Sequence, residues 1–243
     1  MTGYRGKRVL VTGGAGFIGS HLVPKLLEVG ARVRVADNLS RGLRSNLAPV
    51  SSQIEFQETD LTIERACKEA CENQEIIFHL ASKVGGIGYY MNKPAEVFEN
   101  NITMDTLLFR AAQRAKTGKF IFASSAHVYP KRLQSSEDSA ARRESDAEPA
   151  EPAFSYGWGK LGTEKMIQFR QVEGTNKRTA VLIIVGAFGE LQDISLETGS
   201  VIPVLCRRAI EYPGRKPFTH LGQGLETRSY CYVGDVVSGL MAA

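Results

Sequence analysis

A short apolar run that leads directly into a cluster of glycines constrains the fold of this chain more than any other feature. The run reads Val9-Leu10-Val11-Thr12-Gly13-Gly14-Ala15-Gly16-Phe17-Ile18-Gly19, and an amphipathic helical pattern follows it. In a parallel α/β sheet, a strand, a glycine turn and a helix in this order hold the pyrophosphate of a dinucleotide at the helix N-terminus. Gly13 and Gly14 allow the tight turn. Gly16 lets the phosphates approach the backbone, and Gly19 lets the helix pack closely on the strand.

A carboxylate follows the next apolar run, where the ribose of a dinucleotide needs an acceptor. Asp37 ends the run from Ala31 to Ala36, and an acidic residue at this place accepts a hydrogen bond from the ribose 2′-hydroxyl. The same carboxylate repels the 2′-phosphate of NADP, so the sequence predicts NAD. Arg41 lies nearby as a possible partner for that phosphate, which keeps NADP as the alternative.

Apolar runs alternate with amphipathic stretches along the rest of the chain, which predicts a doubly wound parallel α/β sheet, the Rossmann fold. The expected strands span residues 7–12, 31–36, 54–57, 76–81, 119–124 and 179–185, and the expected helices span residues 17–29, 62–72, 95–115, 155–173 and 200–211. The charged segment 131–152 is expected to be a surface loop. We expect residues 1–185 to form the dinucleotide-binding domain. Residues 186–243 are expected to form a small, incomplete substrate-binding segment interleaved with it, because a helical pattern still runs at Ala243.

Composition and charge argue against several classes of protein. The chain has 43% apolar and 23% charged residues and a net charge of +4, with basic residues scattered among acids, so no nucleic-acid partner is expected. The longest apolar run, Ala180 to Phe188, is half the length of a membrane span, so no membrane contact is expected. Cys67 and Cys71 fall on the apolar face of an expected helix and are interpreted as core residues, with a metal pair as the remote alternative. Without a disulfide framework, a zinc set or a secretory segment, we expect a cytoplasmic protein with no bound metal.

Two further features predict an enzyme built on this sheet. Tyr156 and Lys160 lie four residues apart, which places a phenol and an ammonium on one face of an expected helix. The ammonium favours the phenolate, so the pKa of Tyr156 is expected to fall toward working pH, as a general base for a sugar hydroxyl requires. Ser125 follows an expected strand, at the edge where parallel sheets bind ligands, and its hydroxyl can hydrogen-bond the reacting oxygen.

Taken together, these motifs resemble the extended short-chain dehydrogenases/reductases, in the branch of NAD-dependent nucleotide-sugar epimerases and dehydratases. The resemblance covers Lys7 to Met241 and rests on Thr12-Gly13-x-x-Gly16-x-x-Gly19, Asp37-Asn38-Leu39, Asp60-Leu61, Leu80-Ala81-Ser82, Asn101, Ser125, Tyr156, Lys160 and Gly222-x-Gly224-x-x-Thr227-Arg228. It implies that Ser125, Tyr156 and Lys160 form a catalytic triad, and that Asn101 supports the site.

The resemblance also implies two sets of binding residues and a partner. Contacts to NAD are expected from Gly13, Gly16, Phe17, Ile18, Gly19, Asp37, Asn38, Asp60, Leu61, Leu80, Ala81, Ser82, Tyr156 and Lys160. Contacts to a nucleotide-diphosphate sugar are expected from Lys83, Gly85, Gly86, Ser125, His127, Tyr156 and Arg228. The family implies a homodimer in which helices 95–115 and 155–173 pair with their copies.

The expected substrate loop resembles that of two groups of enzymes within this branch. The segment Lys83-Val84-Gly85-Gly86-Ile87-Gly88 resembles the substrate loops of GDP-mannose 3,5-epimerases and GDP-fucose synthases. His127 stands where those enzymes have an acid/base cysteine, and it either replaces that group, since histidine titrates near neutrality, or shapes the sugar pocket. Ala126 and His127 replace the Asp-Glu pair of the 4,6-dehydratases, and Val201 replaces a second acid/base lysine of the 3,5-epimerases. The run Gly186 to Glu190 lacks a substrate-contacting asparagine that the family commonly has.

The most economical mechanism for these residues is C4 epimerisation of a nucleotide-linked sugar. In this hypothesis Tyr156, helped by Lys160 and Ser125, removes the C4 hydroxyl proton while hydride passes to NAD. The 4-keto sugar then turns over in the pocket, and hydride returns to its opposite face. The alternative enzyme is a GDP-hexose 3- or 5-epimerase, or a nucleotide-sugar reductase, with His127 as acid/base. The alternative outside the enzymes is an NAD-binding sensor or scaffold.

Overall fold

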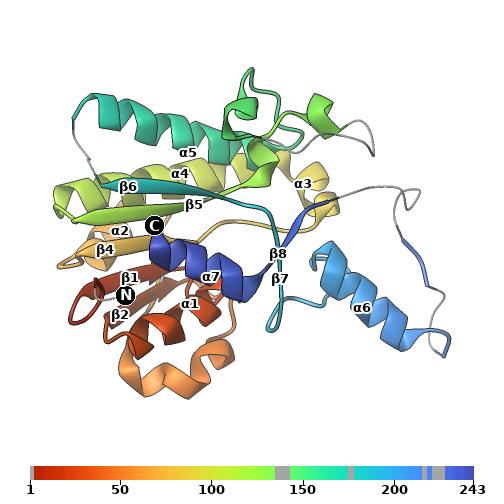
Figure 1. Cartoon of the computed structure of the whole chain (residues 1–243), viewed down its shortest axis with the longest axis horizontal. Coiled ribbons are helices and arrows are strands. Elements are labelled where there is room, and N and C mark those ends of the chain that lie inside the picture. Colours follow the sequence, from red (N-terminus) through yellow and green to blue (C-terminus); the bar gives the residue numbers. More distant parts are fainter. Residues whose placement is uncertain (1–2, 135–142, 175–177, 215–217, 221–227) are drawn as a thin grey trace.

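The chain folds around one parallel sheet of six strands (Figure 1). The computed structural model describes residues 3–134, 143–174, 178–214, 218–220 and 228–243. The strands are β1 (Arg8–Thr12), β2 (Arg32–Asp37), β3 (Ile54–Glu58), β4 (Ile76–His79), β5 (Lys119–Ser125) and β6 (Thr179–Ile184). Their order is β3-β2-β1-β4-β5-β6 and every pairing is parallel. The order reverses between β1 and β4, and ligands bind at the carboxyl edge beside such a reversal.

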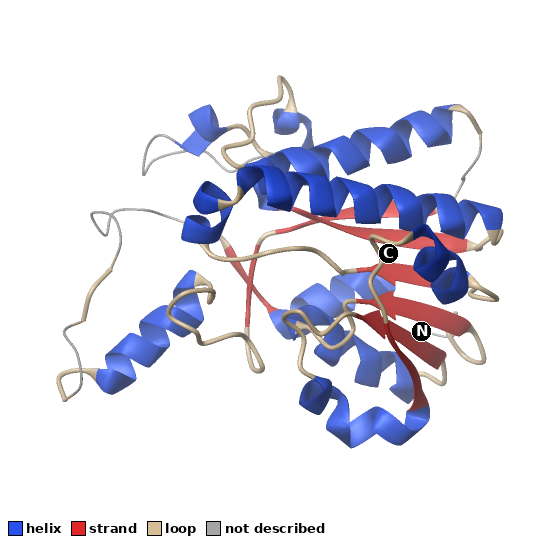
Figure 2. Cartoon of the chain, turned by 180° about the vertical axis from the view of Figure 1, so that it is seen from behind, coloured by secondary structure: helices blue, strands red, loops and turns tan. Residues whose placement is uncertain are grey.

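Helices cover both faces of the sheet (Figure 2). The helices are α1 (Phe17–Glu28), α2 (Glu64–Cys71), α3 (Ile87–Asn92), α4 (Pro94–Arg114), α5 (Ser155–Val172), α6 (Val201–Glu211) and α7 (Val233–Ala242). Successive strand residues point to opposite faces, so Val9 and Val11 pack with α1 and α7 while Leu10 packs with α2, α4 and α5. Cys67 and Cys71 lie fully buried in the second core, as predicted, and burial raises the pKa of both thiols to about 12.

The expected doubly wound sheet is confirmed, and the expected strands and helices differ from the observed ones only at their ends. The structure adds α3 and a short parallel pair of β7 (Gly186–Phe188) with β8 (Tyr230–Tyr232), which the sequence patterns did not predict. In the charged segment 131–152, the described parts form short 3₁₀ turns at Lys131–Gln134 and Glu144–Ala147. Residues 135–142 of that segment lie outside the described residues.

The end of the chain returns to the core. Helix α7 packs on the sheet face that also carries α1, where its side chains Val236, Val237 and Leu240 are buried. The Tyr4 hydroxyl donates a 2.8 Å hydrogen bond to the Met241 carbonyl, which ties the two ends of the chain together (Figure 1). Helix α7 therefore packs on the same core as β1 and α1. No helix in the described part of the chain is long and apolar enough to cross a bilayer.

Candidate active site

The glycine turn after β1 has the geometry of a phosphate cradle. Gly13 has a φ of +67°, and a Cβ added there would lie 2.7 Å from the backbone nitrogen of Ala81, so only glycine fits without strain. A Cβ on Gly19 would lie 2.6 Å from the Cα of Gly14, which explains the close packing of α1 on the turn. The first turn of α1 has neither a side-chain cap nor an acidic residue. Its free N–H groups therefore suit an anion such as a pyrophosphate.

Asp37 lies beside this cradle at the end of β2. Its carboxylate is buried and accepts hydrogen bonds from the backbone nitrogens of Ala15, at 3.0 Å, and Leu39, at 2.9 Å. Burial raises the pKa of Asp37, and the two backbone hydrogen bonds act against that rise. The remaining lone pairs of a carboxylate at this position suit ribose hydroxyls. The residues and the uncapped helix thus fit a bound dinucleotide.

The other residues predicted for the cofactor lie at the same edge of the sheet, with different degrees of exposure. The Asp60 carboxylate is exposed and accepts from the Thr62 nitrogen at 2.9 Å, while Leu61 is buried. Ala81 donates from its nitrogen to the Thr12 hydroxyl at 3.2 Å. The Asn38 side chain accepts from the Ser40 nitrogen at 3.1 Å and so shapes the loop after Asp37.

Asn101 of α4 holds the start of the expected substrate loop. Its fully buried amide accepts from the Lys83 nitrogen at 2.7 Å and from the Ser82 hydroxyl at 3.0 Å, and it donates to the Lys83 carbonyl at 3.0 Å. The Lys83 ammonium pairs with Glu96. The Gly85 nitrogen donates to the Tyr90 hydroxyl at 3.3 Å. The loop thus has a fixed path along the site.

Four expected catalytic side chains gather where β5 meets α5. The Ser82 and Ser125 hydroxyls lie near the Tyr156 hydroxyl and act to lower its pKa. The Ser125 Oγ lies 3.0 Å from His127 Nδ1, and the His127 ring meets the Tyr156 ring edge-on at 5.5 Å between centroids. Lys160 is buried, with its Nζ 5.9 Å from the Tyr156 ring centroid. The geometry brings a phenol, a hydroxyl, an imidazole and an ammonium to one place beside the dinucleotide cradle.

The expected lowering of the Tyr156 pKa is wrong for this structure. Burial raises the pKa of Tyr156 to about 12, against hydrogen bonds from Ser82 and Ser125 that lower it. Burial also lowers the pKa of Lys160, although the charges of Asp105 and Glu164 act to raise it. Desolvation disfavours each charged form. It is the largest effect on the pKa of Tyr156, although the four-residue spacing to Lys160 had predicted an activated phenol.

His127 lies next to Ser125 and Tyr156. Burial lowers its pKa, and the nearby charge of Arg228 acts in the same direction. A neutral imidazole is therefore present near pH 7, which can accept or donate a proton depending on its tautomer. Arg228 itself is exposed. The preceding motif residues Gly222, Gly224 and Thr227 lie outside the described residues.

A buried polar network beneath the site was missed by the sequence analysis. His79, which ends β4, lies 2.7 Å through Nδ1 from the Thr12 hydroxyl and 2.9 Å through Nε2 from Asp105. Asp105 of α4 also accepts from the Thr163 hydroxyl of α5 at 2.9 Å. These residues are fully or almost fully buried. The network joins the strand before the glycine turn to the helix that carries Tyr156 and Lys160.

The fold and this site define a dinucleotide-binding α/β protein with a Tyr-x-x-x-Lys pair at the carboxyl edge of its sheet. The family model described as the NAD dependent epimerase/dehydratase family matches residues 9–243. The chain therefore belongs to that family, and both the family and the NAD cofactor expected from the sequence are confirmed. The described residues include no group of three or more metal-ligating side chains.

Relatives of several activities resemble this chain. GDP-mannose 3,5-epimerase of Arabidopsis thaliana is 29% identical over 96% of this chain and 60% of the relative. UDP-glucuronic acid decarboxylase 1 of the same plant is 30% identical over 97% of this chain and 51% of the relative. The chain thus spans about half to three fifths of the length of these curated relatives.

Solved structures of 4-epimerases share the fold. UDP-N-acetylglucosamine 4-epimerase from Methanobrevibacter ruminantium, in complex with UDP-N-acetylmuramic acid, is 27% identical with a TM-score of 0.84, over 98% of this chain and 72% of that one. UDP-glucose 4-epimerase from Thermus thermophilus, in complex with NAD, is 27% identical with a TM-score of 0.80, over 97% of this chain and 74% of that one.

Proposed function

We propose that this chain carries the NAD site and the catalytic residues of an epimerase that inverts C4 of a nucleotide-diphosphate sugar. The observation that carries the proposal is the position of the Tyr156 hydroxyl. It lies near the Ser82 and Ser125 hydroxyls, next to the cradle formed by the glycine turn and Asp37. The similarity to 4-epimerases that bind NAD or UDP-sugars supports the choice of reaction and substrate.

The residues of the chain have separate roles in this proposal. The glycine turn and the N-terminus of α1 hold the pyrophosphate, and Asp37 holds a ribose. When bound, NAD supplies the hydride acceptor and donor for the sugar carbon. Tyr156 takes the proton of the C4 hydroxyl, Ser125 hydrogen-bonds that oxygen, and Lys160 stabilises the phenolate as it forms. Burial raises the pKa of the phenol to about 12 in the unliganded chain, and the positive charge of bound NAD would act to lower it.

Mass spectrometry of the denatured protein, as purified, tests this proposal first. We expect NAD in stoichiometric amount, since a redox-neutral epimerase keeps its cofactor. We also expect turnover of at least one sugar in a panel of UDP- and GDP-sugars. An empty site that refills better with NADPH than with NAD would overturn the proposal in favour of a reductase.

A second candidate is a GDP-hexose 3- or 5-epimerase with His127 as its acid/base. It is favoured by the contact between His127 and Ser125, at 3.0 Å, and by the similarity to GDP-mannose 3,5-epimerase. Turnover in deuterium oxide separates the two. A 4-epimerase introduces no solvent deuterium at carbon and tolerates His127→Ala. A 3- or 5-epimerase labels C3 or C5 and loses activity with His127→Ala.

We also propose a homodimer formed through α4 and α5. Phe98 on α4 and Trp158 on α5 are large apolar side chains with 39% and 44% of their surface exposed, and Phe169 on α5 is 63% exposed. Such a patch on paired helices suits burial against a copy of itself. Light scattering is expected to give the mass of a dimer, and Phe169→Glu is expected to give a monomer. A monomer for the unaltered chain would contradict this proposal.

A reducing compartment such as the cytoplasm is the setting we propose. The four cysteines are free thiols, and Cys67 and Cys71 lie buried without a disulfide. Free thiols are typical of proteins kept in reducing compartments. Imaging of a tagged full-length protein tests this proposal, and a signal in a secretory compartment would contradict it.

A further inference from the structure

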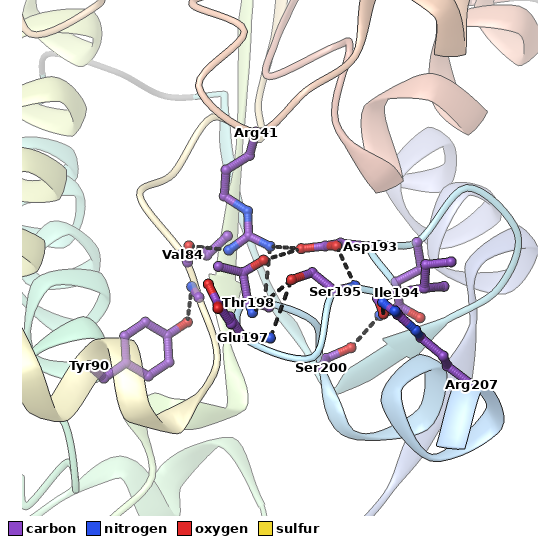
Figure 3. A network of polar contacts seen from close by, with 12 residues as sticks. Arg41, Val84, Tyr90, Asp193, Ile194, Ser195, Glu197, Thr198, Ser200 and Arg207 are labelled. Atoms are coloured by element: carbon purple, nitrogen blue, oxygen red, sulfur yellow. Dashed lines mark hydrogen bonds and ion pairs between the residues drawn. The ribbon is translucent and has the colours of Figure 1, made fainter. Parts of the chain in front are cut away.

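The Arg41 guanidinium joins three segments that are far apart in the sequence (Figure 3). It donates to the Val84 carbonyl at 2.6 Å, to the Asp193 carboxylate at 2.8 Å and to the Thr198 carbonyl at 3.1 Å. Arg41 lies in the loop after β2, Val84 lies in the expected substrate loop after β4, and the two others lie between β7 and α6. One side chain therefore bridges the cofactor side and the sugar side of the site.

The base of Arg41 is fixed to the dinucleotide cradle. Its neighbour Gly42 is buried, and a Cβ added there would lie 2.9 Å from the Ala15 carbonyl carbon and 3.0 Å from the Asp37 carboxylate. The Leu43 nitrogen donates to the Ala15 carbonyl at 3.1 Å. Movement of the glycine turn or of Asp37 would therefore move the backbone that carries Arg41.

The contact with Val84 completes the support of the substrate loop. Consecutive residues of this loop are held from three directions: Lys83 by Asn101, Val84 by Arg41 and Gly85 by the Tyr90 hydroxyl. The Tyr90 ring in turn stacks on the Tyr156 ring, with centroids 5.2 Å apart and planes 5° apart. The Arg41 hydrogen bond thus acts on a loop that packs, through Tyr90, against the catalytic phenol.

The contact with Asp193 fixes the opposite segment. Asp193 also accepts from the Thr198 hydroxyl at 2.7 Å and from the Ser195 nitrogen at 2.8 Å, which closes residues 193–198 into a compact loop. Burial acts to raise the pKa of Asp193, but hydrogen bonds from Thr198, Ser195 and Arg41 hold it below its ordinary value. The Arg207 guanidinium donates to the Ile194 carbonyl at 3.1 Å and attaches this loop to α6.

The Arg41 contacts have little value for stability alone. The side chains of Arg41 and Asp193 are 33% and 38% exposed, and exposed ion pairs contribute little to stability. Their geometry is specific, however, because a planar guanidinium can reach acceptors in several directions and an ammonium cannot do so in the same way. The effect of Arg41 therefore lies in which segments it holds together.

We propose that Arg41 is a positioning residue that couples binding of the dinucleotide to binding of the sugar nucleotide. The inference rests on the proposed function. NAD on Asp37 and the glycine turn fixes the backbone of the Arg41 loop, and Arg41 then holds the Val84 loop and the 193–198 loop over the substrate. Because coupling between two ligands is reciprocal, bound nucleotide strengthens NAD binding by the same factor. This coupling would retain NAD while the sugar is oxidised.

Calorimetry measures the coupling directly. Bound NAD is first removed, and the Kd of NAD is then determined for the full chain without nucleotide and with saturating UDP or GDP, the two probes. We expect nucleotide to tighten NAD binding about five-fold or more in the unaltered chain. In Arg41→Met this factor is expected to fall close to unity. Arg41→Lys and Asp193→Asn are expected to keep part of it, since each retains some of the hydrogen bonds.

A matched control replaces an arginine that is also exposed and paired, but far from the site. Arg65 pairs with Glu69 at 2.7 Å on the surface of α2, and Arg65→Met is expected to keep the full coupling factor. Full coupling in Arg41→Met, or an equal loss in Arg65→Met, overturns the inference. So does an unaltered chain that turns over sugars without any coupling, in which case the proposed function stands. If neither UDP nor GDP binds, the proposed function fails together with the inference.

Discussion

Replacing Asp105 by leucine removes the acceptor at the centre of the buried network beneath the active site. Asp105 accepts from His79 Nε2 at 2.9 Å and from the Thr163 hydroxyl at 2.9 Å. None of the three side chains is more than 1% exposed. The carboxylate of Asp105 can only accept, so the one ring proton of neutral His79 lies on Nε2, and Nδ1 accepts from the Thr12 hydroxyl.

The cost of the change follows from these partners. Each buried donor left without an acceptor costs about 1–3 kcal/mol, and loss of one partner of a buried charge contact costs about 3–5 kcal/mol. Asp105 also supplies negative charge near the buried Lys160. We therefore expect Asp105→Leu to lower the free energy of unfolding by about 3–5 kcal/mol. A domain is stable by only about 5–15 kcal/mol in total.

A double-mutant cycle separates this network from simple core damage. His79→Phe and Asp105→Leu are each expected to be strongly destabilising. The two together replace a polar pair by apolar side chains and are expected to cost about 1–3 kcal/mol less than the sum of the single variants. Urea unfolding followed by circular dichroism supplies the free energies, with the slope on denaturant checked for each variant.

Glu69→Leu is the control, because Glu69 forms an exposed ion pair with Arg65 that is worth at most about 1 kcal/mol. The reasoning is refuted if Asp105→Leu costs no more than this control. It is equally refuted if the effects of His79→Phe and Asp105→Leu add up within error, because additivity means that the two side chains do not interact.

Three further changes test other parts of the site. Burial lowers the pKa of both His79 and His127, so as pH falls the two histidines take up protons in the unfolded chain before they do so in the folded chain. The free energy of unfolding is therefore expected to fall as pH drops below about 6.5. The urea midpoint should fall less steeply with pH in His79→Phe than in the unaltered chain. Tyr156→Phe is expected to abolish epimerisation while calorimetry still detects NAD binding; retained turnover would remove the phenol from the mechanism. Gly13→Ala is expected to destabilise the chain by about 1–2 kcal/mol, from its positive φ alone, and to weaken NAD binding through the clash with Ala81; unchanged calorimetric affinity would argue against the cradle.

The strands could be predicted because each shows a short apolar run or, in β2 and β3, an alternation of apolar and polar residues. The residues from Val9 to Thr12 and the glycines after them are an example, in which local pattern and global fold agree. The helix α3 was not predicted because it spans only Ile87–Asn92, and a helix this short depends on tertiary contacts such as the stacking of Tyr90 on Tyr156. The pairing of β7 with β8 joins Gly186 to Tyr230, and no local pattern encodes a pairing over that separation.

Burial accounts for what the sequence missed at the site. The spacing of Tyr156 and Lys160 correctly placed both on α5, but it carries no information on desolvation, which reverses the expected direction of the pKa shift. His79 lies in an apolar run and resembles an ordinary core residue. A signal was present in α4, where Asp105 falls on the same helical face as Asn101 and Leu108. A carboxylate on a buried face requires a buried partner, and that requirement points to a histidine or a cation.

The structure changes the interpretation of Arg41 that the sequence suggested. In the sequence it was the possible partner of a 2′-phosphate and the reason to keep NADP as an alternative. In the structure its guanidinium donates to Val84, Asp193 and Thr198. A 2′-phosphate would have to draw the guanidinium away from these acceptors, and it would do so next to the Asp37 carboxylate, which repels it. The contacts that join the two binding loops therefore also disfavour binding of NADP. A role for Arg41 in holding the substrate loops thus agrees with the use of NAD.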